Sequence, residues 1–159
     1  MRALTPIVIV IQAAATIISM AVAAPVDPNG AQSALEKSSV IHMLTPCPDQ
    51  PNCVSSLASA ASDPRHALAP MRFGGNPSEA WDKLRQALSA MPRTRVVEDT
   101  GDYLHAEATS LVFRFVDDLE CVIDRANGVI HVRSASRVGY SDLGVNRRRV
   151  EQLRALMGN

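Results

Sequence analysis

The sequence predicts an α+β domain: a twisted, mainly antiparallel sheet of about five strands with two helices packed on one face. Three observations predict it. A helical apolar period follows Asn76, alternating apolar and polar residues run through 95–136 between turn signals, and a second helical period fills the C-terminal end. Because strands joined by short turns pair with their neighbours, the expected order is β-α-β-β-β-β-α.

The first strand of this order is expected within 66–73, and the first helix follows it. Asn76 is a favourable N-cap, Pro77 suits the first helical position, and Glu79 stands three residues after the cap. One face of the helix then carries apolar side chains from Trp81, Leu84, Leu88 and Met91. Pro92 ends the helix, and Trp81 is expected to be a core residue.

Three strands are expected next, over 95–98, 103–110 and 111–124. In the last of these, Leu111, Phe113 and Phe115 alternate with other residues and are expected to face inward. The same parity turns Asp117 inward, where an unpaired carboxylate is costly. Asp117 therefore needs a partner, such as Tyr140 or an N–H of the last helix, or a bulge that turns it outward.

The strongest turn signal is Asn127-Gly128, the preferred pair for a two-residue type I′ hairpin. It pairs Asp124 with His131, Val122 with Arg133 and Glu120 with Ala135. The inner face then holds Leu119, Cys121, Ile123, Ile130, Val132, Ser134 and Ser136. The outer face holds Asp118, Glu120, Asp124, His131, Arg133 and Arg137. Cys121 is thus expected to be a buried free thiol that packs as a small apolar side chain.

The last helix is expected to begin near Ser141 or Asp142, either of which can cap it. Its inner stripe consists of Asn146, Val150, Leu153 and Met157. Gly158 is a suitable terminator.

The N-terminal segment is typical of a signal peptide. Arg2 is the only charge before Asp27, residues 7–24 are almost wholly apolar, and Ala21-Val22-Ala23 suits signal peptidase. We expect a signal peptide over 1–23 that is cleaved after Ala23, a flexible linker over 24–45 and a single domain over 46–158. The expected location is periplasmic or secreted, with no integral membrane span after cleavage. The alternative is a retained anchor, with the domain still outside the cytoplasm.

The chain has three cysteines, and an exported protein favours a disulfide. Cys47 and Cys53 enclose a turn-rich pentapeptide that can bring their side chains together. The alternative is a redox or metal pair, but the spacing is not Cys-x-x-Cys. We therefore expect a structural disulfide, with no cofactor and no metal.

Two segments carry a family resemblance. They are Cys47-Pro48-Asp49-Gln50-Pro51-Asn52-Cys53-Val54-Ser55-Ser56 and the stretch from Val132 to Arg149, VRSASRVGYSDLGVNRRR. With Phe115-Val116-Asp117-Asp118, they resemble the domain-of-unknown-function 1499 family over roughly 46–157. The resemblance implies a small protein of the kind often exported or membrane-anchored in bacteria. It implies no activity, and Cys121 departs from the aromatic or aliphatic residue more usual in the family.

Charge is segregated along the chain. Residues 98–124 hold eight acidic residues and one arginine, a net of −7, whereas 125–159 hold seven arginines and two acidic residues, a net of +5. After removal of 1–23 the net charge is −1, which indicates no general affinity for nucleic acid.

The arginine-rich turn into the last helix is a candidate site for a small anionic or amphiphilic ligand or an envelope partner. Its candidate residues are Arg133, Ser134, Ser136, Arg137, Tyr140, Asp142, Asn146 and Arg147. The structural alternative is that Arg133 and Arg137 form cross-strand ion pairs with outer-face acids. Arg147, Arg148 and Arg149 point about 100° apart and cannot all converge on one ligand.

The leading hypothesis is thus an uncharacterised, non-catalytic envelope protein that binds through 133–147. One alternative is a hydrolase that uses Ser55 or Ser56 as nucleophile, His66 as base and Asp63 to orient it. No Gly-x-Ser-x-Gly motif supports this chemistry. The other alternative is a structural or assembly protein of the envelope.

Overall fold

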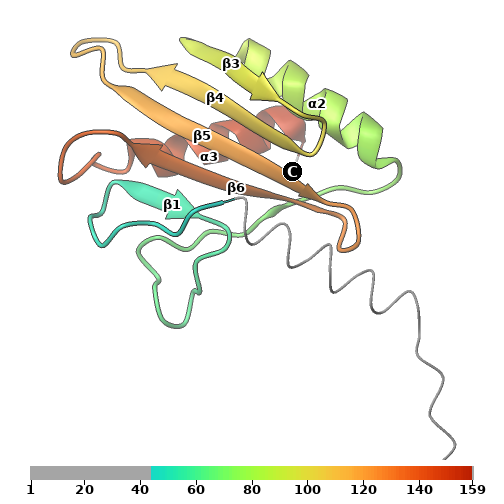
Figure 1. The fold of residues 1–159 in the computed structure, drawn as a ribbon, viewed down its shortest axis with the longest axis horizontal. Helices are drawn as coiled ribbons and strands as arrows, with labels where there is room; N and C mark the ends of the chain where they lie inside the picture. The colour runs from blue at the N-terminus through green and yellow to red at the C-terminus, as the bar shows by residue number, and fades with distance from the viewer. Residues whose placement is uncertain (1–43, 159) are drawn as a thin grey trace, which may run out of the picture.

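The computed structural model describes residues 44–158, which form an α+β domain, as expected (Figure 1). Its elements are β1 (Cys53–Ser55), β2 (Met71–Arg72), α2 (Pro77–Ala90), β3 (Thr94–Asp99), β4 (Tyr103–Thr109), β5 (Val116–Asp124), β6 (Val129–Ser136) and α3 (Val145–Met157). The expected signal peptide and nearly all of the expected linker lie outside the described residues.

The six strands form one antiparallel sheet in the order β1-β6-β5-β4-β3, and β2 also pairs with β6. The expected order is confirmed in outline. The strand expected within 66–73 is only the two-residue β2, and the three-residue β1 precedes it. Both short strands pair along the outer edge of β6, β1 with residues 133–135 and β2 with residues 129–130.

Both helices cover the same face of the sheet, which lies in front of them in Figure 1. Trp81, Leu84 and Leu88 of α2 and Val150 and Leu153 of α3 pack there. The sheet contributes Leu104, Ala106, Leu119, Cys121, Ile123, Ile130 and Val132 to this core. Cys121 is a fully buried free thiol, as expected.

Local capping explains where each helix begins and ends. The Asn76 side chain accepts a hydrogen bond from Ser78 N, and Pro77 is the first residue of α2, as expected. For α3, Gly144 is the N-cap, but the Asp142 carboxylate accepts hydrogen bonds from Gly144 N at 2.9 Å and Asn146 N at 2.6 Å. Gly158 ends α3 with a left-handed backbone.

The β5–β6 hairpin corrects the predicted register. Asp124 pairs with Val129, Val122 with His131 and Glu120 with Arg133, which shifts every predicted pair by two residues. The cause is the Asp124 carboxylate, which accepts hydrogen bonds from Asn127 N and Nδ2 and thereby holds a four-residue turn. Because side chains alternate with a period of two, a shift by two leaves every residue on its predicted face.

The segment before β5 also differs from the prediction. Leu111, Phe113 and Phe115 were expected in the core, but Leu111 and Phe113 are both 73% exposed and Phe115 is 50% exposed. Strand β4 ends at Thr109, and a loop follows that is closed by the hydrogen bonds of Ser110 N to Phe115 O and Phe115 N to Ser110 Oγ. These alternating apolar residues therefore lie in a loop and not in a strand, so their alternation does not turn them toward the core.

Within the described residues, no helix is both long and apolar enough to cross a membrane.

Candidate functional site

A disulfide joins Cys47 to Cys53, with the Cα atoms 5.6 Å apart. The loop that it closes is tied to the rest of the domain through Asn52, whose backbone oxygen accepts hydrogen bonds from Ser136 N and from Asn146 Nδ2. The Asn52 side chain donates to Gly139 O at 2.6 Å. The two motifs of the sequence are therefore in direct contact, although Asn52 and Asn146 are 94 residues apart.

Three of the predicted ligand residues belong to this buried network. Asn146 is fully buried; its Nδ2 also donates to Ser136 Oγ at 3.0 Å, and its Oδ1 accepts from Ser134 Oγ at 2.6 Å. Because buried polar groups need partners, Ser134, Ser136 and Asn146 are satisfied internally and hold β6 against α3.

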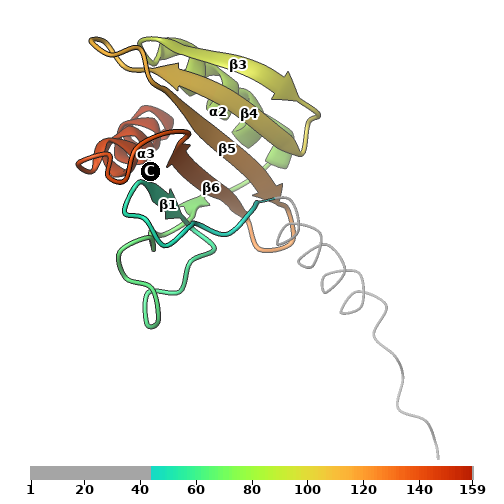
Figure 2. The same ribbon diagram turned by 60° about the vertical axis from the view of Figure 1, so that its left-hand side comes forward.

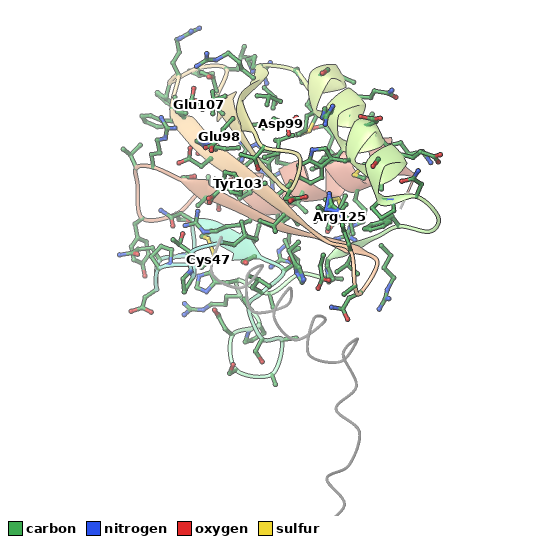
Figure 3. The ribbon with its side chains drawn as sticks, turned by 45° about the vertical axis from the view of Figure 1, so that its right-hand side comes forward. Cys47, Glu98, Asp99, Tyr103, Glu107 and Arg125 are labelled. Atoms are coloured by element: carbon green, nitrogen blue, oxygen red, sulfur yellow. A yellow bond between two sulfur atoms is a disulfide. The ribbon has the colours of Figure 1, made fainter. Side chains whose placement is uncertain are left out.

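Two further predicted ligand residues form ion pairs on the outer face of the sheet. Arg133 binds Glu120 at 2.6 Å, and Arg137 binds both Asp118 and Glu107 at 2.7 Å. Figure 3 shows Glu107 on the same strand as Tyr103, whose hydroxyl donates to Glu120 at 3.0 Å. In this outer-face network, Arg133 and Arg137 form ion pairs with acids of neighbouring strands, which was the structural alternative to a ligand site.

The network shifts the pKa values of its carboxyl groups. Hydrogen bonds from Arg137 and then Arg95 lower the pKa of Glu107. Burial opposes ionisation of Asp118, but the hydrogen bonds from Arg137 and His105 outweigh it, so the pKa of Asp118 is also lowered. Both carboxylates are thus held in the charged form that Arg137 needs.

The remaining predicted ligand residues have separate environments. Arg147 donates to Arg65 O and Ala67 O and so fastens the 56–70 segment to α3. Asp142 caps α3. Tyr140 is 73% exposed on the β6–α3 loop. The eight predicted residues therefore do not converge on one ligand position.

Of the alternative hydrolase, the structure contains the expected contact between His66 and Asp63, but within residues 44–158 neither serine hydroxyl hydrogen-bonds to the His66 ring. His66 places Nδ1 2.7 Å from Asp63 and Nε2 3.1 Å from Gln50 O. Ser55 Oγ accepts from Leu57 N. Ser56 Oγ accepts from Val132 N at 2.9 Å and lies 3.1 Å from His131 Nδ1. Ser56 fills the gap between β1 and β2 along the edge of β6, because its own N–H donates to Val132 O.

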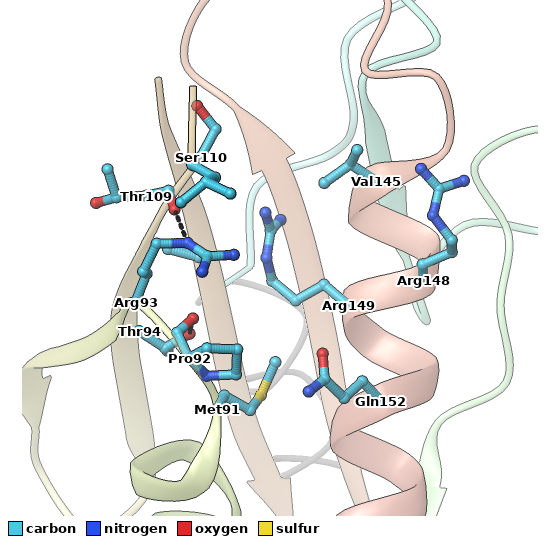
Figure 4. A pocket seen from close by; sticks show the side chains of 12 residues that line it. Met91, Pro92, Arg93, Thr94, Thr109, Ser110, Val145, Arg148, Arg149 and Gln152 are labelled. Carbon is cyan, nitrogen blue, oxygen red and sulfur yellow. Dashed lines mark hydrogen bonds between the residues drawn. The ribbon is translucent and has the colours of Figure 1, made fainter. Parts of the chain in front are cut away.

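A cleft of about 330 Å³ lies between α3 and the ends of β3 and β4 (Figure 4). Its apolar lining includes Met91, Pro92, Leu111 and Val145. Its polar lining includes Arg93, Arg148, Arg149, Thr109, Ser110 and Gln152, and no acidic residue among 44–158 lines it. In Figure 4, Arg93 stands on one side of the cleft, and Arg149 and Gln152 stand on α3 opposite. Apolar walls with a few polar groups are typical of ligand sites.

The arginines of the cleft differ in how many of their guanidinium nitrogens have partners within the protein. Arg149 pairs with Asp117 at 2.6 Å, and both side chains are at least nine-tenths buried. This is the partner that Asp117 required, supplied by α3. Arg93 donates only Nε, to Thr109 O, so its two terminal nitrogens have no partner among residues 44–158. Arg93 thus offers a free guanidinium edge for an anion.

Left-handed backbone conformations gather around this cleft. In the described part of the chain, the non-glycine residues with positive φ are Arg93, Arg114 and Leu143, with φ of 55°, 53° and 53°. They lie on the three connections at this end of the sheet: 91–93, 110–115 and 137–144. Non-glycine residues in this region are uncommon and cluster at functional sites. We call these three connections, together with Val145 and Arg148, the loop end.

Sequence reasoning missed Arg93 and Leu111 as site residues. Arg93 follows the proline that ends α2 and carries no motif, and the alternation around Leu111 predicts a core position for it. The available signal was the break in strand pattern around Ser110, because a serine that closes a turn next to three exposed apolar residues marks a loop.

Fold and site together define a small, disulfide-bonded α+β domain with a basic, apolar-lined cleft at one end of its sheet. The family model described as "Protein of unknown function (DUF1499)" matches residues 43–157, so the chain belongs to that family. This confirms the membership expected from the two motifs. No curated protein matches the chain.

Proposed function

We propose that this protein is a non-catalytic binding domain of the cell envelope, which takes an anionic amphiphile in the cleft beside α3. The observation that carries the proposal is the lining of the cleft, which combines apolar side chains with arginines and, within the described part of the chain, contains no acidic residue. The apolar part of the ligand packs on Met91, Leu111 and Val145. Its anionic group binds the free edge of Arg93.

The location is part of the same proposal. The apolar segment 7–24 acts as a signal peptide that is cleaved after Ala23 and brings the domain into the periplasm or the medium. The Cys47–Cys53 disulfide supports this location, because such bonds persist in oxidising compartments. Mass measurement of the protein purified from the envelope tests it. Ala24 is the expected N-terminus, and an intact Met1 or Arg2 start contradicts cleavage.

Only part of the predicted 133–147 segment enters the proposed site. Val145 lines the cleft, whereas Arg133 pairs with Glu120 on the outer face, and Ser134, Ser136 and Asn146 hydrogen-bond to one another within the domain. The segment thus contributes by shaping the loop end and by fixing α3, which carries Arg148 and Arg149.

Calorimetric titration with decyl phosphate, kept below its micelle concentration, tests the proposal. Arg93→Gln is expected to weaken binding roughly ten- to hundredfold, since a hydrogen bond to a charged group contributes about 1.5–3 kcal/mol. Arg125→Gln is the matched control, because Arg125 is exposed at the opposite end of the sheet and pairs with Asp102. The neutral alcohol decanol should bind more weakly than decyl phosphate. Equal binding of decyl phosphate to both variants, or none to the wild type, contradicts the proposal.

A further inference from the structure

Exposed apolar side chains concentrate at the loop end. Of the eleven large hydrophobic residues exposed within 44–158, eight lie there: Leu111, Val112, Phe113, Phe115, Val138, Tyr140, Leu143 and Val145. Leu143 is 84% exposed and Val112 is 75% exposed. Such a concentration on a small domain marks an interaction surface.

The two apolar loops lie at the same end of the sheet. Thr109 of β4 pairs with Val116 of β5, and Asp117 pairs with Ser136 of β6. Arg137 N also donates to Val116 O, so the 137–144 loop leaves the sheet where the 110–115 loop returns to it. Figures 1 and 2 show both loops at this end from two directions.

The loop end is also positively charged. Arg93, Arg114 and Arg148 have no carboxylate partner in the described chain; Arg93 and Arg148 donate to backbone carbonyls. Four acids of the strands and loops at this end have partners: Asp117 pairs with Arg149, Asp118 and Glu107 pair with Arg137, and Asp142 accepts from N–H groups at the start of α3. The apolar loops are therefore accompanied by three arginines that have no carboxylate partner within residues 44–158, whereas the one acid in these loops, Asp142, is held by backbone N–H groups.

We propose that the loop end docks onto the surface of an anionic lipid bilayer. Phe113, Leu143 and their apolar neighbours enter the boundary between headgroups and acyl chains, and Arg114 and Arg148 contact the lipid phosphates. An apolar tip with flanking arginines matches the polarity of this boundary, and an anionic surface attracts basic residues. A second copy of the chain fits less well, because a symmetric contact would bring unpaired arginines together.

This proposal rests on the proposed function, because it takes from it a partner that is anionic and amphiphilic. It adds that the partner is a lipid bilayer. Leu111, Val145 and Arg148 belong both to the loop end and to the cleft lining, so the two proposals are separated at other residues. Phe113 and Arg114 do not line the cleft, whereas Arg93 does. Phe113 packs on Phe115, with ring centroids 5.5 Å apart, and both side chains are exposed, so their loss spares the core.

Co-sedimentation of the protein purified from the envelope with vesicles tests the proposal. The vesicles are phosphatidylglycerol mixed with phosphatidylcholine, or phosphatidylcholine alone. The wild type is expected to bind the anionic vesicles at least tenfold more tightly than the neutral ones. The variant Phe113→Ser/Arg114→Gln should lose at least tenfold in affinity for the anionic vesicles. The matched control, Val97→Ser/Arg125→Gln, should stay within twofold of the wild type.

Equal vesicle binding by the loop variant and the wild type overturns the docking proposal. An absence of vesicle binding by the wild type also overturns it. If light scattering then shows a dimer that Phe113→Ser converts to a monomer, the surface is assigned to self-association. Decyl phosphate separates the two proposals. Vesicle binding without decyl phosphate binding would contradict the cleft proposal and support the docking proposal. Decyl phosphate binding without vesicle binding would contradict the docking proposal and support the cleft proposal.

Discussion

Arg149 of α3 donates to the buried carboxylate of Asp117 at the start of β5, at 2.6 Å. The same guanidinium donates to Ser134 Oγ at 3.1 Å, so one side chain joins α3 to two neighbouring strands. It also forms part of the wall of the cleft. The pair therefore links the stability of the domain to the geometry of the candidate site.

Breaking this buried pair should be costly. Arg149→Met leaves the Asp117 carboxylate buried without its cation, and we expect the free energy of unfolding to fall by about 3–5 kcal/mol. Urea unfolding followed by circular dichroism measures it. The exposed pair of Arg125 and Asp102 is the control, and Asp102→Asn should cost less than about 1 kcal/mol.

The double variant Arg149→Met/Asp117→Leu removes both charges together. It should recover most of the stability that Arg149→Met loses, because no uncompensated charge then stays buried. A loss below about 1 kcal/mol in Arg149→Met would show that the carboxylate finds water or another donor, contrary to the buried pair described above.

The three cysteines should behave as one buried thiol and one disulfide pair. Burial raises the pKa of the Cys121 thiol and shields it from reagents, so the native protein should show no reactive thiol with Ellman's reagent at pH 8. Unfolded without reductant, each chain should show one thiol, and after reduction it should show three. More than one thiol in the unreduced, unfolded protein would mean that Cys47 and Cys53 are not joined.

Loss of the disulfide should destabilise the domain modestly. The loop between Cys47 and Cys53 is short, so its closure contributes about 2 kcal/mol in the chain-entropy model. Cys47→Ser/Cys53→Ser should lower the free energy of unfolding by about that amount, and Cys121→Ala serves as the comparison for loss of a sulfur elsewhere. An unchanged midpoint in the double variant would remove any stabilising role of the bond.

The outer-face network should make stability depend on acid pH. The folded-state pKa values of Glu107 and Asp118 are lowered, so their stabilising contribution is present above the unfolded-state pKa of about 4 and is lost as pH falls through the folded-state values. Arg137→Gln should therefore unfold more easily than the wild type at pH 7, and the difference should shrink below about pH 4. Urea midpoints at pH 7, 5, 4 and 3 measure it. A difference that stays constant to pH 3 would place the effect of Arg137 elsewhere.

Local signals predicted the parts of the fold that local physics determines. The Asn76 cap, the α2 stripe and the inner position of Cys121 depend on neighbours in sequence, and all are confirmed. The hairpin register was wrong because the side chain of Asp124, outside the Asn-Gly pair, selects the turn. The predicted inward and outward positions of the side chains are nevertheless correct, because a shift by two residues keeps the alternation.

The candidate site was harder to predict because its determinants are distant in sequence. Asn146 looked available for a ligand, but its amide is satisfied by Asn52, which lies in the disulfide loop. Arg149 was one of three consecutive arginines, and only the packing of α3 on β5 selects it as the partner of Asp117. The cleft brings together residues 91–94, 108–111 and 145–152, and no motif spans them.

The most direct test of the binding site is a map of amide chemical shifts during titration with decyl phosphate. We expect saturable changes centred on Arg93, Leu111 and Val145, with the outer-face residues Glu120 and Arg133 unchanged. Saturable changes centred instead on the outer face or on the His66 region, or no saturable change at all, would contradict it.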